Sequence, residues 1–210
     1  IEINVQGRNI YPGLIEMRTR YGLPKAEKKK PFSWGKKEVI ESTDQRAVNV
    51  NRAIRSDYRA SLAFKADNKS AKELRSQGFS TVLTYRNDGI ARGTSALVTI
   101  GDENANKAVV KLDASAHYSF NKGSSTQTFP VSKMGAVALL RQTHLDAQWF
   151  VAQTPRPFTD QSLDAWVSSQ KVPQIFETGD WQTALTADEI GDEFGVQYII
   201  EGSGDEYRRL

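Results

Sequence analysis

Cysteine is absent from the 210-residue sequence, and its absence excludes disulfide bonds and thiolate metal sites. The cellular compartment stays open, because reducing and oxidising spaces both tolerate chains without cysteine. Histidine is scarce as well, since His117 and His144 are the only two. A lone histidine is usually a packed or surface residue. We therefore keep His117 as a candidate catalytic residue and rank His144 below it.

Long apolar runs and a strong net charge are also missing. No apolar stretch approaches the roughly 20 residues of a membrane-spanning helix, so we expect a soluble protein with no membrane partner. The formal charge is +3, from 28 basic and 25 acidic residues, which is too balanced to indicate nucleic acid as a partner. The one dense basic cluster, Lys28–Lys30 with Lys25 and Lys36–Lys37 beside it, is typical of a solvated loop.

The composition that remains is that of an ordinary globular protein. With 39% hydrophobic and 25% charged residues, the chain has enough apolar material for one core. We therefore expect a single domain over residues 1–210. The sequence begins at Ile1, without a methionine or a signal sequence, which we interpret as a processed product or a piece of a longer protein.

The opening residues have the pattern of two strands. Ile1, Ile3 and Val5 alternate with polar residues, and an apolar run follows the Pro12-Gly13 turn from Leu14 onward. This pattern predicts a strand, a turn and a second strand.

Residues 23–66 have little periodicity, and we expect them to form a long surface insertion that covers one end of the fold, with a short helix over 57–64. Phe32 and Trp34 lie in this segment. In a loop of this length such aromatic residues more often pin the loop in place than line a pocket.

From Asp67 onward the pattern is that of alternating helices and strands. We expect helices after Asp67, from Pro130, after Asp160 and after Asp180, with Gly78 and Gly195 as helix ends. We expect strands at 79–85, 95–100, 107–112, 172–177 and 196–201, and a loop at 86–93. This alternation predicts an α/β fold. The long helix from Pro130 is apolar around much of its circumference, which predicts packing on two sides.

The segment Asn121–Gln127 is rich in glycine and serine. Such a loop could suggest a phosphate cradle, but the Gly-x4-Gly-Lys-Ser/Thr spacing of a P-loop is missing. The sequence therefore gives no support for a phosphate site there.

Several runs resemble the amidohydrolase superfamily, in particular its imidazolonepropionase-like members. Pro12–Glu16 is similar to the strand that leads to a His-x-His metal pair, and 78–82 to the second barrel strand. The runs 173–177 and 198–202 resemble the later ligand-bearing strands. More narrowly, 88–93, 117–120, 140–143 and 146–149 resemble the N-terminal, metal-ligand-poor half of long tandem proteins secreted by bacteria.

This resemblance implies a partial or incomplete (β/α) TIM-like barrel in a bacterial protein, periplasmic or secreted. The family uses zinc or another divalent metal to activate water. The two histidine positions fall here on Arg18 and Arg20, and the later ones on Glu177 and on or beside Glu201. Arginine offers only hydrogen-bond donors and cannot coordinate a cation. We therefore expect no metal and no cofactor.

If the strands are arranged as in the family, charged side chains meet at the carboxyl-terminal mouth of the barrel. The expected substrate-binding set is Arg18, Arg20, Arg86, Arg92 and Glu201, and the candidate catalytic residues besides His117 are Asp88 and Glu177. Arginines that face glutamates would form a metal-free ion-pair cluster. We favour charge compensation over binding of an anion.

Three functions agree with these observations. The first is a pseudoenzyme, a non-catalytic amidohydrolase-like domain that supports an active partner. The second is an active hydrolase of C–N bonds with a non-standard site. The third is a binding module for an anionic small molecule. We prefer the first.

A closed barrel of eight strands needs about 250 residues, so this chain supplies too few strands. We expect an open or incomplete sheet whose edges lie near Leu14-Ile15 and Ile199-Ile200. A second copy, the chain's own rearranged termini or the rest of a parent protein would cover them.

Overall fold

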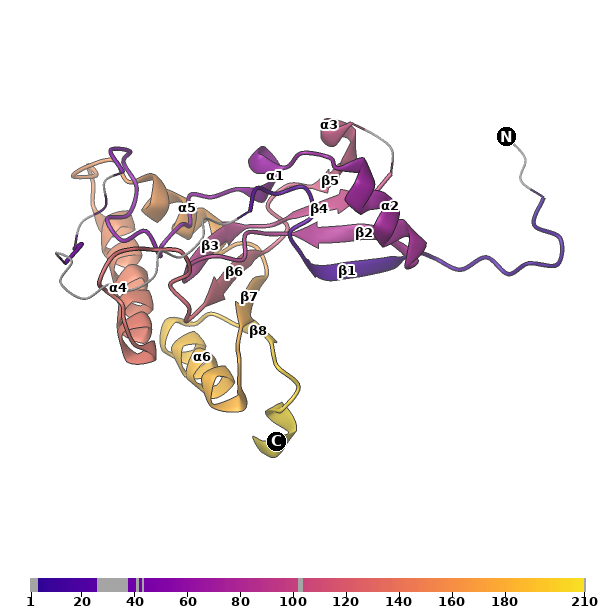
Figure 1. Cartoon of the computed structure of the whole chain (residues 1–210). Helices are drawn as coiled ribbons and strands as arrows, with labels where there is room; N and C mark the ends of the chain where they lie inside the picture. Colours follow the sequence, from indigo (N-terminus) through magenta and orange to yellow (C-terminus); the bar gives the residue numbers. More distant parts are fainter. Residues whose placement is uncertain (1–3, 26–37, 41, 43, 102–103, 210) are drawn as a thin grey trace.

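The computed structural model describes residues 4–25, 38–40, 42, 44–101 and 104–209. Several residues discussed above lie outside these ranges, namely Ile1, Ile3, Lys28–Lys30, Phe32, Trp34 and Lys36–Lys37. The described chain is an α/β structure with two open four-stranded sheets (Figure 1).

The first sheet has the strand order β1-β2-β4-β5. Its strands are β1 Leu14–Thr19, β2 Phe79–Thr84, β4 Ala96–Thr99 and β5 Val109–Lys111. Strands β1 and β2 are parallel, and the other pairs are antiparallel. Three helices accompany this sheet, α1 Ala60–Ala63, α2 Asn68–Ser76 and α3 Ala105–Ala108.

The second sheet has the order β3-β6-β7-β8. Its strands are β3 Ala91–Thr94, β6 Ala116–Ser119, β7 Gln174–Glu177 and β8 Tyr198–Glu201. Strands β6, β7 and β8 are parallel, joined by helices α4 Lys133–Ala152, α5 Gln161–Ser169 and α6 Trp181–Phe194. A short 3-10 helix, η1 Glu206–Arg209, follows β8. Parallel strands need such crossover helices, so this half is built from β-α-β units.

The predicted α/β class is confirmed, whereas the barrel is not. Within the described residues the strands form two open sheets and no closed barrel. Strands β1 and β8 each stand at the end of a sheet, with a hydrogen-bonded neighbour on one side only. Their outward residues Leu14, Ile15 and Ile199 are exposed.

Aspartates cap helices α2, α5 and α6, as the sequence predicted, whereas Ser132 caps the longest helix, α4. Asp67, Asp160 and Asp180 each accept a hydrogen bond from a backbone N–H in the first turn of α2, α5 and α6. These bonds satisfy donors that have no partner within a helix. Helix α6 ends at Gly195, whose φ of 69° is left-handed, the usual role of a glycine at that position.

The segment that we expected to lie over the surface is in part a core element. Ala53, Ile54 and Ala60 have no exposed surface, and residues 54 and 59 form isolated bridges with β3. Gly93 allows this close approach, because a Cβ there would lie 1.9 Å from the carbonyl oxygen of Tyr58. The description as a surface insertion is therefore wrong for residues 53, 54, 60 and 64, which are buried, whereas Leu62 is exposed.

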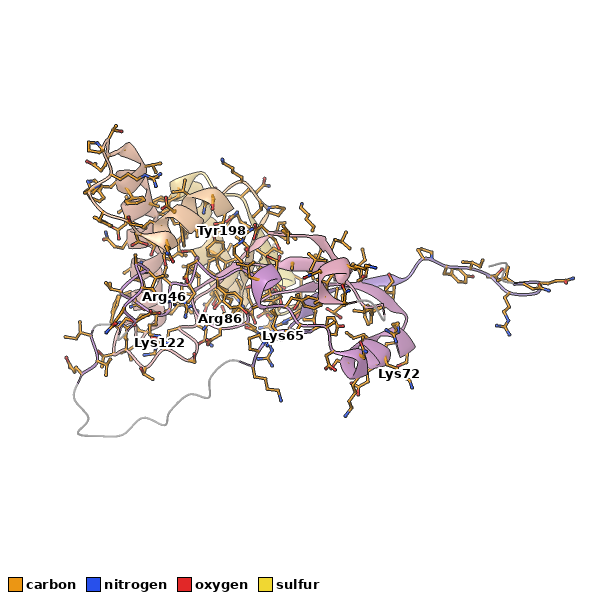
Figure 2. All side chains as sticks on the ribbon, turned by 90° about the horizontal axis from the view of Figure 1, so that it is seen from above. Arg46, Lys65, Lys72, Arg86, Lys122 and Tyr198 are labelled. Carbon is orange, nitrogen blue, oxygen red and sulfur yellow. The ribbon has the colours of Figure 1, made fainter. Side chains whose placement is uncertain are left out.

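Two further expectations are corrected. Residues 4–13 form no strand but an exposed arm that extends away from the body (Figures 1 and 2), because no neighbouring strand pairs with it. Helix α4 buries one face only, and Met134, Leu145 and Trp149 on the other face are exposed. Apolar composition around the helix therefore did not correspond to packing on two sides.

Strand boundaries also differ from prediction around β3 and β5. The end of the loop expected at 86–93 instead belongs to β3, a short strand held between β6 and the bridge from residue 54. The first half of the strand expected at 107–112 is instead a helical turn, α3, capped by the side chain of Asn104. Tertiary pairing decides such short segments more than local propensity does.

Candidate functional site

An ion-pair cluster lies where the parallel strands end. Arg18 is near the end of β1, Glu177 ends β7, Glu201 ends β8, and Arg92 is on β3. Arg18 donates from Nη2 to Glu177 Oε1 at 2.7 Å, and its Nε lies 2.8 Å from Glu201 Oε1. Arg92 Nη1 donates to the other oxygen of Glu177. Two guanidinium groups therefore face two carboxylates, and the cluster carries no net charge.

Burial differs sharply between the two arginines. The Arg92 side chain is 4% exposed and that of Arg18 is 56% exposed, while Glu177 is 21% exposed. Arg92 also donates from Nε to the carbonyl oxygen of Gly89 at 3.2 Å. Arg92 is thus the buried member of the cluster, which we call its anchor, and Arg18 is the solvent-exposed member. The attraction of Glu201, and then of Glu177, raises the pKa of Arg18 against the opposing effect of burial.

Tyr85 and His117 lie beneath this cluster. The Tyr85 hydroxyl donates to Glu201 Oε2 at 3.2 Å, and its ring stacks on the His117 imidazole with a centroid distance of 3.8 Å and an interplanar angle of 11°. Burial, followed by the nearby Glu201 charge, raises the Tyr85 pKa. The phenol therefore stays protonated and acts as a hydrogen-bond donor.

His117 has the surroundings of a packed residue. It is 2% exposed, and its Nε2 lies 2.9 Å from Ser115 Oγ. Burial and the Arg92 charge lower its pKa to about 3, so the ring is neutral at physiological pH. Among the described residues no hydrogen bond joins His117 to Asp88 or Glu177. The three candidate catalytic residues thus do not form one constellation.

Asp88 holds a loop in place. Its carboxylate accepts bonds from Ser124 N at 2.6 Å, from Ser124 Oγ at 2.7 Å and from Arg86 Nη2 at 2.7 Å. Burial alone would raise the Asp88 pKa, but the bonds from Arg86 and Ser124 lower it overall. Gly123 has a φ of 65°, and a Cβ there would lie 2.0 Å from Asp88 Oδ1. Asp88 therefore fixes the 121–127 loop at close range.

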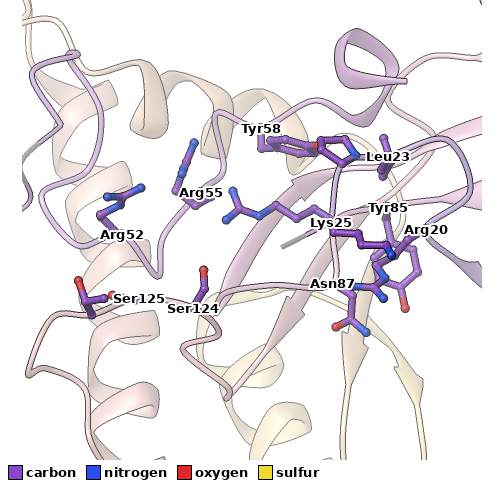
Figure 3. A pocket seen from close by; sticks show the side chains of 13 residues that line it. Arg20, Leu23, Lys25, Arg52, Arg55, Tyr58, Tyr85, Asn87, Ser124 and Ser125 are labelled. Carbon is purple, nitrogen blue, oxygen red and sulfur yellow. The ribbon is translucent and has the colours of Figure 1, made fainter. Parts of the chain in front are cut away.

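Arg20 and Arg86 do not join the ion-pair cluster. They line a separate cavity of about 220 Å³ together with Lys25, Arg52 and Arg55. Figure 3 shows that the 121–127 loop supplies Ser124 and Ser125 to the cavity wall, with Arg52 and Arg55 opposite and Tyr58, Tyr85 and Asn87 further along. The sequence-predicted substrate set is thus divided between two places.

A broader cavity of about 820 Å³ opens beside the ion-pair cluster. Arg18, Arg92 and Glu177 line it, together with residues 119–122 and the start of α6. This hollow, which we call the mouth, lies at the carboxyl ends of β1 and β7.

The side chains at this mouth do not suit a divalent metal. Arg18 and Arg92 line the mouth and offer hydrogen-bond donors only, and Glu177 and Glu201 already accept bonds from Arg18. Across the described ranges, no three histidine, aspartate or glutamate side chains gather into a potential metal site. His144 is distant from the mouth, since it lies on α4 and packs against Trp166 and Phe194.

None of the described helices is long and apolar enough to cross a bilayer.

Comparison with known proteins identifies one solved structure of the same fold. An amidohydrolase from Thermotoga maritima MSB8 is superposed with a TM-score of 0.68 at 17% sequence identity. The match covers 95% of this chain and 55% of that chain, so this chain spans about half the length of the amidohydrolase. No protein-family model matches the sequence, and no curated protein matches it either. The fold is thus amidohydrolase-like.

Sequence reasoning missed Lys25, Arg52, Arg55 and the serines of the 121–127 loop as neighbours of Arg20 and Arg86. The sequence did not indicate where residues 51–58 lie, because they were assigned to the surface insertion over residues 23–66. The spacing of Arg52 and Arg55, together with Ser124 and Ser125, carries no motif that points to a common cavity. The pairing of residues 53–55 alongside β3 brings these side chains together.

Proposed function

We propose that this chain is a non-catalytic amidohydrolase-like domain in which ion pairs stand where the family would hold its metal. The carrying observation is the charge-balanced cluster of Arg18, Arg92, Glu177 and Glu201 at the ends of β1, β7 and β8. A carboxylate that accepts two charge-assisted bonds is poorly available to a cation. The cluster therefore links the two sheets, and its ion pairs replace the metal centre that would carry out hydrolysis.

Hydrolysis in this fold family depends on a metal-activated water. In this chain the mouth offers arginine donors and engaged carboxylates in place of free metal ligands. Burial lowers the pKa of His117 to about 3, and its ring is stacked on Tyr85 and does not line the 820 Å³ cavity, so it is a weak base without access to that cavity. These features support a structural role.

The exposed sheet edges indicate where a partner of this supporting domain would bind. Strands β1 and β8 are sheet ends with exposed apolar residues, and unpaired edges of this kind recruit further strands. Since the chain spans about half of its structural neighbour, the proposed partner is the remainder of a parent barrel. A second copy of this chain is the competing occupant.

Activity measurements test the proposal. The purified chain is incubated with a panel of amides and cyclic imides, with and without added Zn²⁺ or Mn²⁺, and compared with the Glu177→Gln variant. The proposal predicts no hydrolysis above the variant under either condition. Turnover by the parent chain that the Glu177→Gln change abolishes would contradict it and would favour an active hydrolase with a non-standard site.

A further inference from the structure

The cavity lined by Arg20, Lys25, Arg52, Arg55 and Arg86 is strongly basic. These are five cationic side chains, and none of its lining residues is acidic. Arg55 pairs with Asp57 at 3.4 Å and Arg86 with Asp88 at 2.7 Å. For Arg20, Lys25 and Arg52, the described part of the chain contains no ion-pair partner. An unbalanced group of three cations in one hollow repels itself and attracts an anion.

Hydroxyl groups complete the wall opposite Arg52 and Arg55 (Figure 3). Ser124, Ser125 and Thr126 line it from the loop that Asp88 holds. Ser125 Oγ is buried and has no hydrogen-bond partner among the described residues. A buried hydroxyl without a partner costs free energy, so a ligand that supplies an acceptor would relieve this cost.

The cavity wall is also held firmly in shape. The backbone N–H of Arg52 donates to Gln127 Oε1 at 2.6 Å, and Gln127 Nε2 donates to the carbonyl oxygens of Ile40 and Val50. Gln127 thus ties the loop to the segment that carries the arginines. The backbone that carries Arg52 is thus fixed, which lowers the cost of ordering this part of the wall when an anion binds.

We propose that this cavity is a binding site for a small phosphorylated molecule. Arginine forks match phosphate oxygens two at a time, and three uncompensated cations suit a group with two or more negative charges. The volume of about 220 Å³ is below the usual range of about 300–1,000 Å³ for ligand pockets. The site therefore accommodates the anionic group and a few further atoms. The proposal is independent of the metal-free role of Arg18 and Arg92.

Calorimetric titration with inorganic pyrophosphate tests the proposal, in about 150 mM salt to screen weak surface binding and with EDTA to remove metals. Saturable binding near one equivalent is expected. Arg52→Gln and Arg20→Gln should each weaken it at least about tenfold, the factor that corresponds to about 1.4 kcal/mol. Neither side chain has a hydrogen-bond partner in the described structure, so both variants should fold normally.

Matched variants distinguish binding in this cavity from general attraction of an anion to the basic protein surface. Arg141→Gln removes a cation from α4 whose partner is Glu193, and binding should be unchanged. Ser125→Ala should weaken pyrophosphate binding without lowering the stability of the free protein. No saturable binding, or equal binding by all variants, would overturn the proposal. Citrate bound more tightly than pyrophosphate, with the same dependence on Arg20 and Arg52, would overturn the assignment to phosphate.

Discussion

Replacing Arg92 with methionine isolates the contribution of the buried anchor of the ion-pair cluster. The Arg92→Met variant leaves the carboxylate of Glu177, which is 21% exposed, with Arg18 as its remaining partner. Breaking a buried pair by removing one partner costs about 3–5 kcal/mol. Because Glu177 keeps some solvent and one arginine, we expect the lower end, about 3 kcal/mol. For a chain of this size that loss lowers Tm by about 6–12 °C.

Arg18→Met is the matched control for this experiment. Arg18 contacts the same carboxylate but its side chain is 56% exposed, and exposed ion pairs contribute about 0–1 kcal/mol. Urea unfolding of both variants, fitted with one common slope m, measures the loss of unfolding free energy in each. A double variant with Glu177→Gln should recover part of the Arg92→Met loss, because Arg18 and Glu201 then balance each other in charge. Equal costs for Arg18 and Arg92, or a larger cost for Arg18, would refute the assignment of Arg92 as the anchor.

Three further predictions follow from the same contacts. Arg20→His alone should not create metal binding, since Glu177 and Glu201 stay engaged by Arg18; calorimetry with Zn²⁺ checks this, and stoichiometric binding would count against it. Stability should fall as the pH drops below about 6.5, because burial lowers the pKa of His117 to about 3 and that of His144 to about 4. The unfolded chain then binds more protons than the folded one, and His144→Gln should reduce the slope of unfolding free energy against pH by up to about 1.4 kcal/mol per pH unit; an unchanged slope would show that His144 is not buried as a neutral ring. Finally, charged substitutions at the β1 edge, such as Leu14→Lys, should reduce any self-association seen by solution scattering, and a compact monomer with a closed barrel would contradict the open sheets.

The C-terminal part of the fold was predictable because its signals are local. Asp180 before α6, Gly195 after it and the apolar run of β8 agree with the structure element by element. Cap residues and strand runs act over a few positions, so a single sequence contains the information.

The central part depended on contacts between distant residues. Strand β3 contains Arg92 and Gly93 and has no strand-like composition, yet it pairs because residue 54 docks on one side and β6 on the other. The exposed face of α4, with Met134 and Trp149, could not be distinguished from a buried one by composition.

The candidate site was predicted in part. Arg18, Arg92, Glu177 and Glu201 come together as the resemblance implied. Arg20 and Arg86 were assigned to the same group but line a different cavity. Arg18, near the end of β1, and Arg20, just after it, therefore have different surroundings, which depend on the loops that cover the strand ends.

The metal content of the purified chain tests the central proposal most directly. The protein is produced in medium supplemented with zinc, nickel and manganese, dialysed without chelator and subjected to elemental analysis. The ion-pair account predicts well under one equivalent of any of these metals, because Arg18 and Arg92 occupy the carboxylates of Glu177 and Glu201. A content close to one equivalent per chain, lost on the Glu177→Gln substitution, would contradict it.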